Sequence, residues 1–361
     1  MSLPENKDPK PQRMDVKHSL MLGNELNMSN YSFFSQSDDS SWNFYCIQQV
    51  QMWLSGEIPY SKDLDCFRNL PPRQKQVIEE ILGFFSPADG LVSASIVRQL
   101  QSATTSIEVG FLFFQGAIES VHNEVYSLFI KMFASDPKDE LRIFNMVRDI
   151  PCVGRKAAFI QKYIDSDIHV SLRCLAQACA EGIFFVTLFS VIFFFRKLGL
   201  LEAFVFANEQ ISKDETLHRD FFCAKAEEKG LREYMPAALE IIEEAVQIEE
   251  EYIRYLLREP IQSRELDDAT GITVDNLVQL SQLLADQILV NCGAAVRYGA
   301  SPNLPWMSDI GLQKKNNFYE KRVGSYKKGS LVNQLDWRRN ITPKEPLQRE
   351  DCVLDCGSID F

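Results

Sequence analysis

Residues 119–126 read ESVHNEVY, and residues 215–218 read ETLH. Each stretch places a glutamate three residues before a histidine, and such positions project from one face of a helix about one turn apart. A carboxylate and an imidazole arranged in this way can bind the same metal ion. The chain has only four histidines, and two of them, His122 and His218, have this partner. The repeated pair therefore predicts a metal site built on helices.

A lone acid precedes each pair by the length of a helix and a turn. Asp89 lies in FFSPADGLV, 30 residues before Glu119, and Glu181 lies in ACAEGIFF, 34 residues before Glu215. Four helices would then bring four carboxylates and two imidazoles to one interior point. This is the ligand set of ferritin-like di-iron or di-manganese carboxylate bundles. The alternative is four separate buried acids, each satisfied by hydrogen bonds.

The rest of the chain from about residue 40 to 300 predicts an all-α fold, a ferritin-like helical bundle. Apolar residues at helical spacing dominate this region, and strand-like alternation is nearly absent. We expect Pro87 to bend the first long helix. The expected helices cover about residues 73 to the 90s, 104–134, 138–149, 154–165, 170–197, 203–229, 236–258 and 273–298.

Two polar ends flank the predicted bundle. Residues 1–30 are polar, contain three prolines and show no period, so we expect a disordered arm. Residues 31–326 form the predicted helical domain. Residues 327–361 mix lysine, glycine, proline and aspartate, and they end in Ser-Ile-Asp-Phe. We expect this part to be a flexible tail that docks through its last residues, the alternative being an end without a role.

Composition and charge exclude several classes of function. The 361 residues are 45% hydrophobic and carry a net charge of −12, which argues against a nucleic-acid binder. Nine cysteines without paired spacing, after a polar N-terminus, predict reduced thiols and a cytoplasmic location. The uncharged run 182–195 has 14 residues, whereas a membrane span needs roughly 20. We expect it to be a core helix, with no membrane partner.

An oxidisable side chain is predicted beside the metal site. Tyr126 follows His122 by four residues, on the same helical face and about 6 Å further along the axis. An apolar wall would protect a reactive species there, although any core contains such residues. The apolar residues that share the faces of Glu181 and Glu215 are Phe185, Phe189 and Ile211.

In these motifs the chain resembles the small, radical-generating subunit of class I ribonucleotide reductase, from about Trp42 to Tyr326. Several long motifs occur in the family's order, which makes the resemblance more specific than one signature would. They are SKDL (61–64), FFSPADGLV (84–92), ESVHNEVYSLFI (119–130), DIPC (149–152), AEGIFF (180–185), NEQISKDETLH (208–218) and NFYEKRVGSY (317–326).

The resemblance implies a role for each matching residue. Tyr126 matches the tyrosine that is oxidised to a stable radical, within a pocket formed by Phe185, Phe189 and Ile211. The residues that match the six ligands of the family's di-iron site are Asp89, Glu119, His122, Glu181, Glu215 and His218.

The resemblance also implies a path for the radical. Trp53 matches the tryptophan of the family's long-range electron-transfer path, and Asp214 matches the acid that links this tryptophan to His122. Tyr326 matches the tail tyrosine that hands the radical towards the large subunit.

The implied cofactor is an oxo-bridged pair of iron ions in each chain, and an Mn–Fe pair would use the same ligands. The implied reaction uses O2 and an electron donor to form the radical, which a separate large subunit uses to reduce ribonucleotides to deoxyribonucleotides for DNA synthesis. The tail would dock on that subunit, and the small subunit would be a homodimer.

Three other functions stay open at the level of sequence. One is a di-iron or Mn/Fe oxidase with its own substrate, although Asp89, Tyr126 and Tyr326 argue against it. Another is a non-catalytic paralogue that stabilises an active small subunit, which the complete ligand set disfavours. The last is ferritin-like iron storage, in which the tail and the set of Trp53 and Asp214 would have no purpose.

Overall fold

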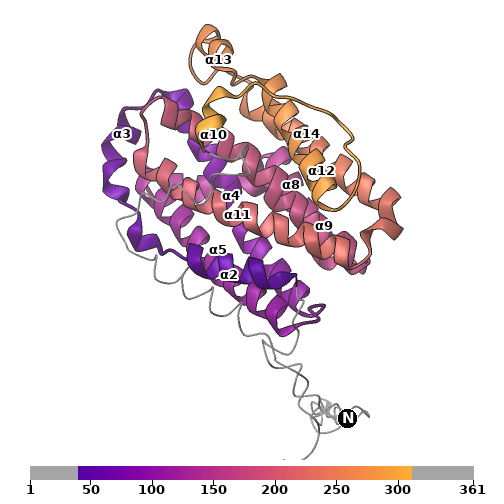
Figure 1. Ribbon diagram of the computed structural model, residues 1–361. Helices are drawn as coiled ribbons and strands as arrows, with labels where there is room; N and C mark the ends of the chain where they lie inside the picture. The colour runs from indigo at the N-terminus through magenta and orange to yellow at the C-terminus, as the bar shows by residue number, and fades with distance from the viewer. Residues whose placement is uncertain (1–39, 311–361) are drawn as a thin grey trace, which may run out of the picture.

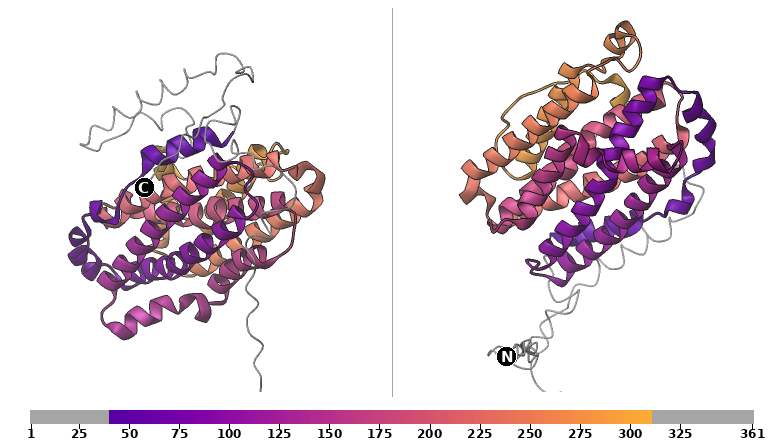
Figure 2. Two further views of the ribbon diagram at one scale, coloured as in Figure 1. Left: turned by 90° about the horizontal axis from the view of Figure 1, so that it is seen from below. Right: turned by 180° about the vertical axis from the view of Figure 1, so that it is seen from behind.

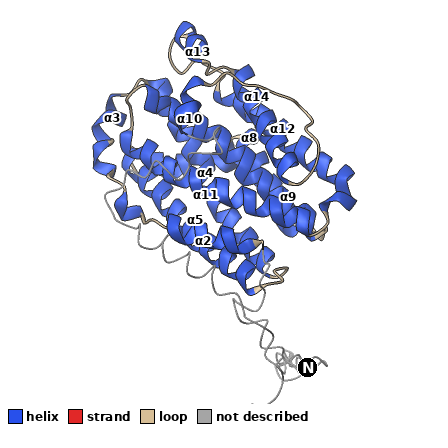
Figure 3. Cartoon of the chain, in the orientation of Figure 1, coloured by secondary structure: helices blue, strands red, loops and turns tan. Residues whose placement is uncertain are grey.

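The computed structural model describes residues 40–310, and every regular element in that range is helical (Figures 1 and 3). The all-α prediction is thereby confirmed. The α-helices are α2 (Ser41–Gln51), α3 (Leu64–Asn69), α4 (Pro72–Leu100), α5 (Ser106–Phe133), α6 (Pro137–Phe144), α7 (Met146–Asp149), α8 (Pro151–Asp165), α9 (Val170–Cys179), α10 (Val186–Lys197), α11 (Glu202–Glu228), α12 (Met235–Leu256), α13 (Arg264–Thr270) and α14 (Val274–Asn291). A π-helical turn, η4 (Ala180–Phe185), joins α9 to α10, and short 3-10 turns are η2 (Ser55–Glu57), η3 (Tyr60–Lys62), η5 (Leu231–Tyr234) and η6 (Pro305–Ile310).

The long helices pack side by side into one bundle (Figures 1 and 2). Helix α4 packs along α5 and also contacts α8, while α11 packs along α9 and α10. Helix α2 covers α5 on one side, and α12 and α14 pack together on the other. The interior between these helices holds the apolar side chains of one continuous core. The predicted arm (1–30) and tail (327–361), with Tyr326, lie outside the described residues.

Helix α4 starts where the sequence predicts, with Pro72 in its first turn, where the missing N–H has no helical partner to lose. It continues through Pro87 to Leu100, close to the predicted end in the 90s. The side-chain amide of Asn123 on the neighbouring helix α5 donates a hydrogen bond of 2.8 Å to the backbone carbonyl of Ser86, the residue before this proline. Helix α5 therefore contacts α4 directly at the proline-containing segment.

Some predicted boundaries are wrong. The segment 170–197 is not one α-helix, because η4 interrupts it, and the segment 138–149 divides into α6 and α7 at Asn145. Helix α14 ends at Asn291 rather than near 298. Beyond it Gly293 has φ of +73°, and the chain folds back so that the carboxylate of Asp286 accepts hydrogen bonds from the backbone of residues 297–299. The short helices α2, α3 and α13 were not predicted individually.

Two helical segments are long and apolar enough to cross a membrane by composition alone. They are Pro72–Leu100 and Val170–Lys197. In the most apolar 18-residue stretch of each segment, 67% and 100%, respectively, is buried within the fold. The second contains the run 182–195, whose side chains lie in the core, as expected from its length. Burial of this kind is typical of the central helices of a soluble bundle.

Helix α11 contains Glu215 and His218 of the predicted metal site, and its start is fixed by a side chain that is distant in the sequence. Asp63 is 1% exposed, and its two oxygens accept hydrogen bonds from the backbone N–H groups of Ala203 (3.0 Å) and Phe204 (2.7 Å). Leu201, just before the helix, has a positive φ of 54°, so the backbone enters α11 through a sharp turn.

Replacing Asp63 with alanine should lower the free energy of unfolding by about 1–2 kcal/mol, because the N–H groups of the first turn lose their cap. Chemical denaturation of the purified variant measures this. Asp65→Ala is the matched control, since that aspartate is exposed and pairs only with Arg68 at 3.6 Å. Equal stability of the two variants would contradict the capping role.

Candidate metal centre

Four carboxyl groups and two imidazoles meet inside the bundle, as the sequence spacing predicts. They come from four segments, namely α4, α5, η4 and α11. Each of the six side chains is fully buried, at 0% exposure. The residues are Asp89, Glu119, His122, Glu181, Glu215 and His218.

Glu119 and Glu215 lie between the two imidazoles. Glu119 places one oxygen 3.3 Å from Nδ1 of His122 and the other 3.1 Å from Nδ1 of His218. Glu215 places one oxygen 3.0 Å from Nδ1 of His122 and the other 3.8 Å from Nδ1 of His218. Each of these two carboxylates therefore faces both imidazoles, a position from which it could contact two metal ions.

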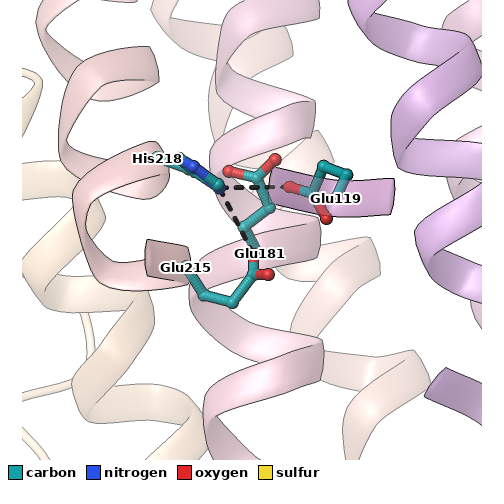
Figure 4. Close-up of side chains that lie close together, drawn as sticks. All are labelled: Glu119, Glu181, Glu215 and His218. Carbon is teal, nitrogen blue, oxygen red and sulfur yellow. Dashed lines mark ion pairs between the residues drawn. The ribbon is translucent and has the colours of Figure 1, made fainter. Parts of the chain in front are cut away.

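The remaining two acids mark the two ends of the cluster. Ligand atoms of Glu119, Glu181, Glu215 and His218 lie within 4.8 Å of one another, close enough to hold one ion (Figure 4). Asp89 belongs to the other end, where its charge interacts with those of Glu119, His122 and Glu215. The geometry therefore suggests two neighbouring positions that share Glu119 and Glu215.

The cluster leaves many of its polar atoms without hydrogen bonds. Both oxygens of Asp89 and one oxygen of Glu181 have no hydrogen-bond partner, and the oxygens of Glu119 and Glu215 have none apart from their ion pairs with Nδ1 of the two histidines. Buried polar atoms are normally paired, and buried carboxylates need compensating charge. Two divalent cations would balance four carboxylates while both imidazoles stay neutral. The donor set of oxygens and imidazole nitrogens suits iron or manganese.

Hydrogen bonds on the far side of each imidazole turn Nδ1 towards the cluster. Nε2 of His122 lies 3.2 Å from the carboxylate of Asp214. Nε2 of His218 lies 3.1 Å from the side-chain amide of Gln48, and the amide oxygen accepts a hydrogen bond from this nitrogen. Metal-binding histidines commonly donate their second N–H in this way. Asp214 was expected here from the sequence, whereas Gln48 was not.

Two glutamines hold Glu181. Gln115 on α5 and Gln177 on α9 donate hydrogen bonds of 2.9 Å and 2.6 Å to the same oxygen of this carboxylate, which leaves the other oxygen free to face the cluster. Sequence reasoning missed both. A signal existed, because Gln115 lies one helical turn before Glu119 and Gln177 one turn before Glu181.

Tyr126 lies next to the cluster and is fully buried. Its hydroxyl donates a hydrogen bond of 3.0 Å to Asn208 on α11, whose amide in turn donates to the carbonyl of Phe204 at 2.8 Å. Burial, and then the charge of Asp89, raise the pKa of Tyr126 well above its ordinary value. The phenol is therefore neutral at physiological pH. Asn208 was missed, although it shares a helical stripe with Glu215.

The ring stacked on Tyr126 is Phe85, at 4.8 Å between centroids. The sequence did not single out this residue, which lies one turn before Asp89. The predicted wall residues Phe185 and Phe189 lie against Phe85, at 5.4 Å and 5.3 Å. Ile211 is also fully buried. Phe85 thus packs directly on the tyrosine, and Phe185 and Phe189 pack on Phe85.

Trp53 connects to the cluster through Asp214. Its indole N–H donates a hydrogen bond of 2.7 Å to the same Asp214 oxygen that lies 3.2 Å from His122. The indole ring also stacks on the imidazole of His122, at 5.9 Å and 24°. The structure brings these three residues together as the sequence predicts. Tyr326, the fourth residue of the predicted path, lies outside the described residues.

The pKa values show how the metal-free cluster holds protons. Burial raises the pKa of Glu119, but hydrogen bonds from the two imidazoles outweigh it and lower the value to about 2. Burial lowers the pKa of His218, but Glu119 and Glu215 outweigh it and raise the value to about 10. The pKa of His122 is likewise raised, with Asp214 as its strongest partner. Burial raises the pKa of Asp89 and of Glu181.

An interior site of four carboxylates and two histidines on four helical segments defines a dinuclear carboxylate helical bundle. Within this class, the pattern of the family described as ribonucleotide reductase, small chain, matches residues 30–304, and the protein belongs to that family. It is 35% identical over 306 residues to a ribonucleoside-diphosphate reductase small chain of Arabidopsis thaliana, a match that covers 87% of the relative and 84% of this chain.

Solved structures show the same fold. A dimanganese(II) NrdF of Streptococcus sanguinis aligns with a TM-score of 0.67 at 20% identity, over 98% of that protein and 77% of this chain. The Rnr4 homodimer of Saccharomyces cerevisiae aligns with a TM-score of 0.64 at 25% identity, over 85% of that protein and 76% of this chain.

Metal binding should release protons, because both imidazoles are protonated in the metal-free cluster and must lose the Nδ1 proton to bind a metal. We expect roughly two or more protons per chain at pH 7. Calorimetric titration with Mn(II) without oxygen, in buffers of different ionisation enthalpy, measures the number. His218→Ala should reduce both the metal bound and the protons released, whereas exposed His169→Ala should change neither. A binding enthalpy that is the same in all buffers would contradict the prediction.

Proposed function

We propose that this chain is the radical-generating subunit of a cytoplasmic ribonucleoside-diphosphate reductase. The observation that carries the proposal is the buried cluster of six ligand residues, with unpaired atoms facing inward, beside Tyr126 and connected to Trp53. Iron storage needs neither of these two neighbours. A non-catalytic paralogue would have no reason to keep all six ligand residues in a costly buried arrangement.

We propose two iron ions per chain as the cofactor. Asp89, Glu119, His122, Glu181, Glu215 and His218 would hold the two ions, with Glu119 and Glu215 facing both imidazoles. The same donors suit manganese, and the related protein of Streptococcus sanguinis is named as a dimanganese protein. Metal analysis of the active protein separates an Fe–Fe pair from an Mn–Fe or Mn–Mn pair.

When bound, the metal pair would supply the chemistry of dioxygen reduction and the oxidising power for removal of one electron from the protein. Tyr126 gives up that electron together with its phenolic proton. Asn208 orients the phenol but cannot take the proton, since an amide oxygen is a very weak base. The proposed proton acceptors are the carboxylates whose charges raise the pKa of Tyr126, Asp89 first among them. Burial behind Phe85 keeps water and reductants away from the radical.

The radical would leave the site through Trp53. Asp214 accepts hydrogen bonds from both Trp53 and His122, so it can hold a proton as the indole is oxidised and return it as the indole is reduced. From Trp53 the radical would pass by way of Tyr326 to the large subunit, which binds and reduces the ribonucleotide. The tail (327–361) would dock on that subunit. A homodimer, as named for the yeast relative, is the proposed assembly, and an external donor would supply electrons.

Tyr126→Phe should bind the same amount of metal as the unchanged protein but give no tyrosyl radical signal after Fe(II) loading and exposure to oxygen. Electron paramagnetic resonance with a parallel metal count measures both. Tyr252→Phe is the matched control, since Tyr252 is equally buried and donates only to the carbonyl of Glu80. A radical signal that persists in Tyr126→Phe would refute the assignment.

Deletion of residues 355–361 should abolish ribonucleotide reduction with the large subunit while leaving metal content and the radical signal intact. The reason is that the deletion removes the proposed docking peptide but touches nothing in the metal centre. Turnover assays with increasing large subunit measure the loss. Full activity of the truncated protein would show that another segment mediates docking.

A further inference from the structure

A second buried charged pair lies deep in the bundle, outside the metal centre. Lys156 on α8 and Glu249 on α12 are both 0% exposed, and their charged atoms are 2.7 Å apart. Three aromatic rings surround the ammonium group, with centroids at 4.0 Å for Tyr252, 4.3 Å for Phe84 and 5.3 Å for Phe184. Burying such a pair removes two charges from water and contributes little net stability, so stability alone does not explain it.

The ammonium group also contacts the π-helical turn that carries Glu181. Nζ of Lys156 donates a hydrogen bond to the carbonyl oxygen of Phe184 at 3.4 Å, within η4. Helices α8, α12 and η4 all contact one another at this place. The pair thus connects two helices to the turn.

The opposite side of the turn is held by close packing. A Cβ atom added at Gly182 would lie 2.4 Å from Cδ of Arg219, the residue after His218. The backbone of η4 at Gly182 therefore packs against the side chain of Arg219 on α11, while the carbonyl of Phe184 accepts the hydrogen bond from Lys156. The turn is fixed between these two contacts.

The register of this turn decides where Glu181 points. A π-helical turn contains one more residue than an α-helical turn, and one residue in a helix corresponds to a rotation of about 100°. If the turn relaxed to α-helical geometry, the side chains on it would be redirected by about that angle relative to α9 or α10. Glu181 would then leave the cluster, or Phe185 would leave its place against Phe85.

We infer that Lys156, held in place by Glu249, is a positioning residue that keeps η4 in its π-helical register and so directs Glu181 to the metal centre. The inference rests on the proposed function only in assigning Glu181 to a metal. The effect on the turn itself is independent of that assignment.

The test replaces the pair by apolar residues of similar size, Lys156→Met with Glu249→Leu. Such replacements of buried pairs are often neutral or stabilising, so the variant should fold. The matched control is Lys162→Met with Glu244→Leu, which removes a pair at 2.7 Å between the same two helices but on their exposed side. Circular dichroism and thermal unfolding establish that both full-length variants are folded.

In the buried-pair variant, amides of residues 180–186 should exchange hydrogen about tenfold faster than in the control, because the turn opens more often. The affinity of the protein for Mn(II) should also fall about tenfold or more, as is usual when a group that supports a metal ligand is lost. Unchanged exchange and unchanged Mn(II) affinity would overturn the inference.

A measurement on the unchanged protein tests the inference without any variant and without metal. If Lys156 holds the turn, the amides of residues 180–186 should exchange as slowly in the metal-free protein as those of neighbouring α9. Fast exchange that slows only when metal is added would show that the metal holds the turn, and would overturn the inference. If the protein bound no metal at all, the proposed function would fail, while slow exchange of the turn would still support the role of Lys156.

Discussion

Four carboxyl groups buried in an apolar bundle require positive charge beside them, and the rest of this structure depends on how that requirement is met. Without metal, the two imidazoles supply part of the charge, which explains why the pKa of His218 rises to about 10 and that of Glu119 falls to about 2. Asp89 and Glu181 are left without an equivalent partner, and their pKa values rise. The metal-free cluster is thus balanced by protons, which bound cations would replace.

The surrounding helices convert this requirement into a defined geometry. Each ligand pair on α5 and α11 is set by helical spacing, and Asp63 fixes where α11 begins. Asp214 and Gln48 turn the imidazoles so that Nδ1 faces inward. Glu181 is the exception, because it stands on a π-helical turn and depends on contacts from other elements.

The difference between ligands placed by helical spacing and a ligand placed by tertiary contacts also explains what the sequence could predict. Residues separated by three or four positions on one helix must share a face, so the ligand pairs and Tyr126 could be placed without a structure. Lone acids such as Asp89 could be assigned because the scheme occurs twice. Gln48 was missed because its partner lies on another helix, far away in the sequence, and no local pattern marks it. Asn208 lies on the helical stripe of Glu215, but that stripe does not show that its partner is Tyr126 on another helix. The π-helical turn could not be predicted for a related reason, since the run 182–195 is apolar on every side and carries no periodicity from which a change of register could be detected. Local periodicity therefore predicted the bundle and most of the ligand residues, while tertiary contacts determine how the ligands are aimed.

The proposal that Glu119 and Glu215 together hold two metal ions inside the bundle is the one on which the proposed chemistry rests. Anomalous diffraction at the manganese edge, from crystals of the protein loaded with Mn(II) without oxygen, observes it directly. We expect two peaks per chain, about 3.5–4 Å apart, with both carboxylates within bonding distance of both peaks. A single peak, or peaks that do not contact Glu119 and Glu215, would contradict the bridging arrangement.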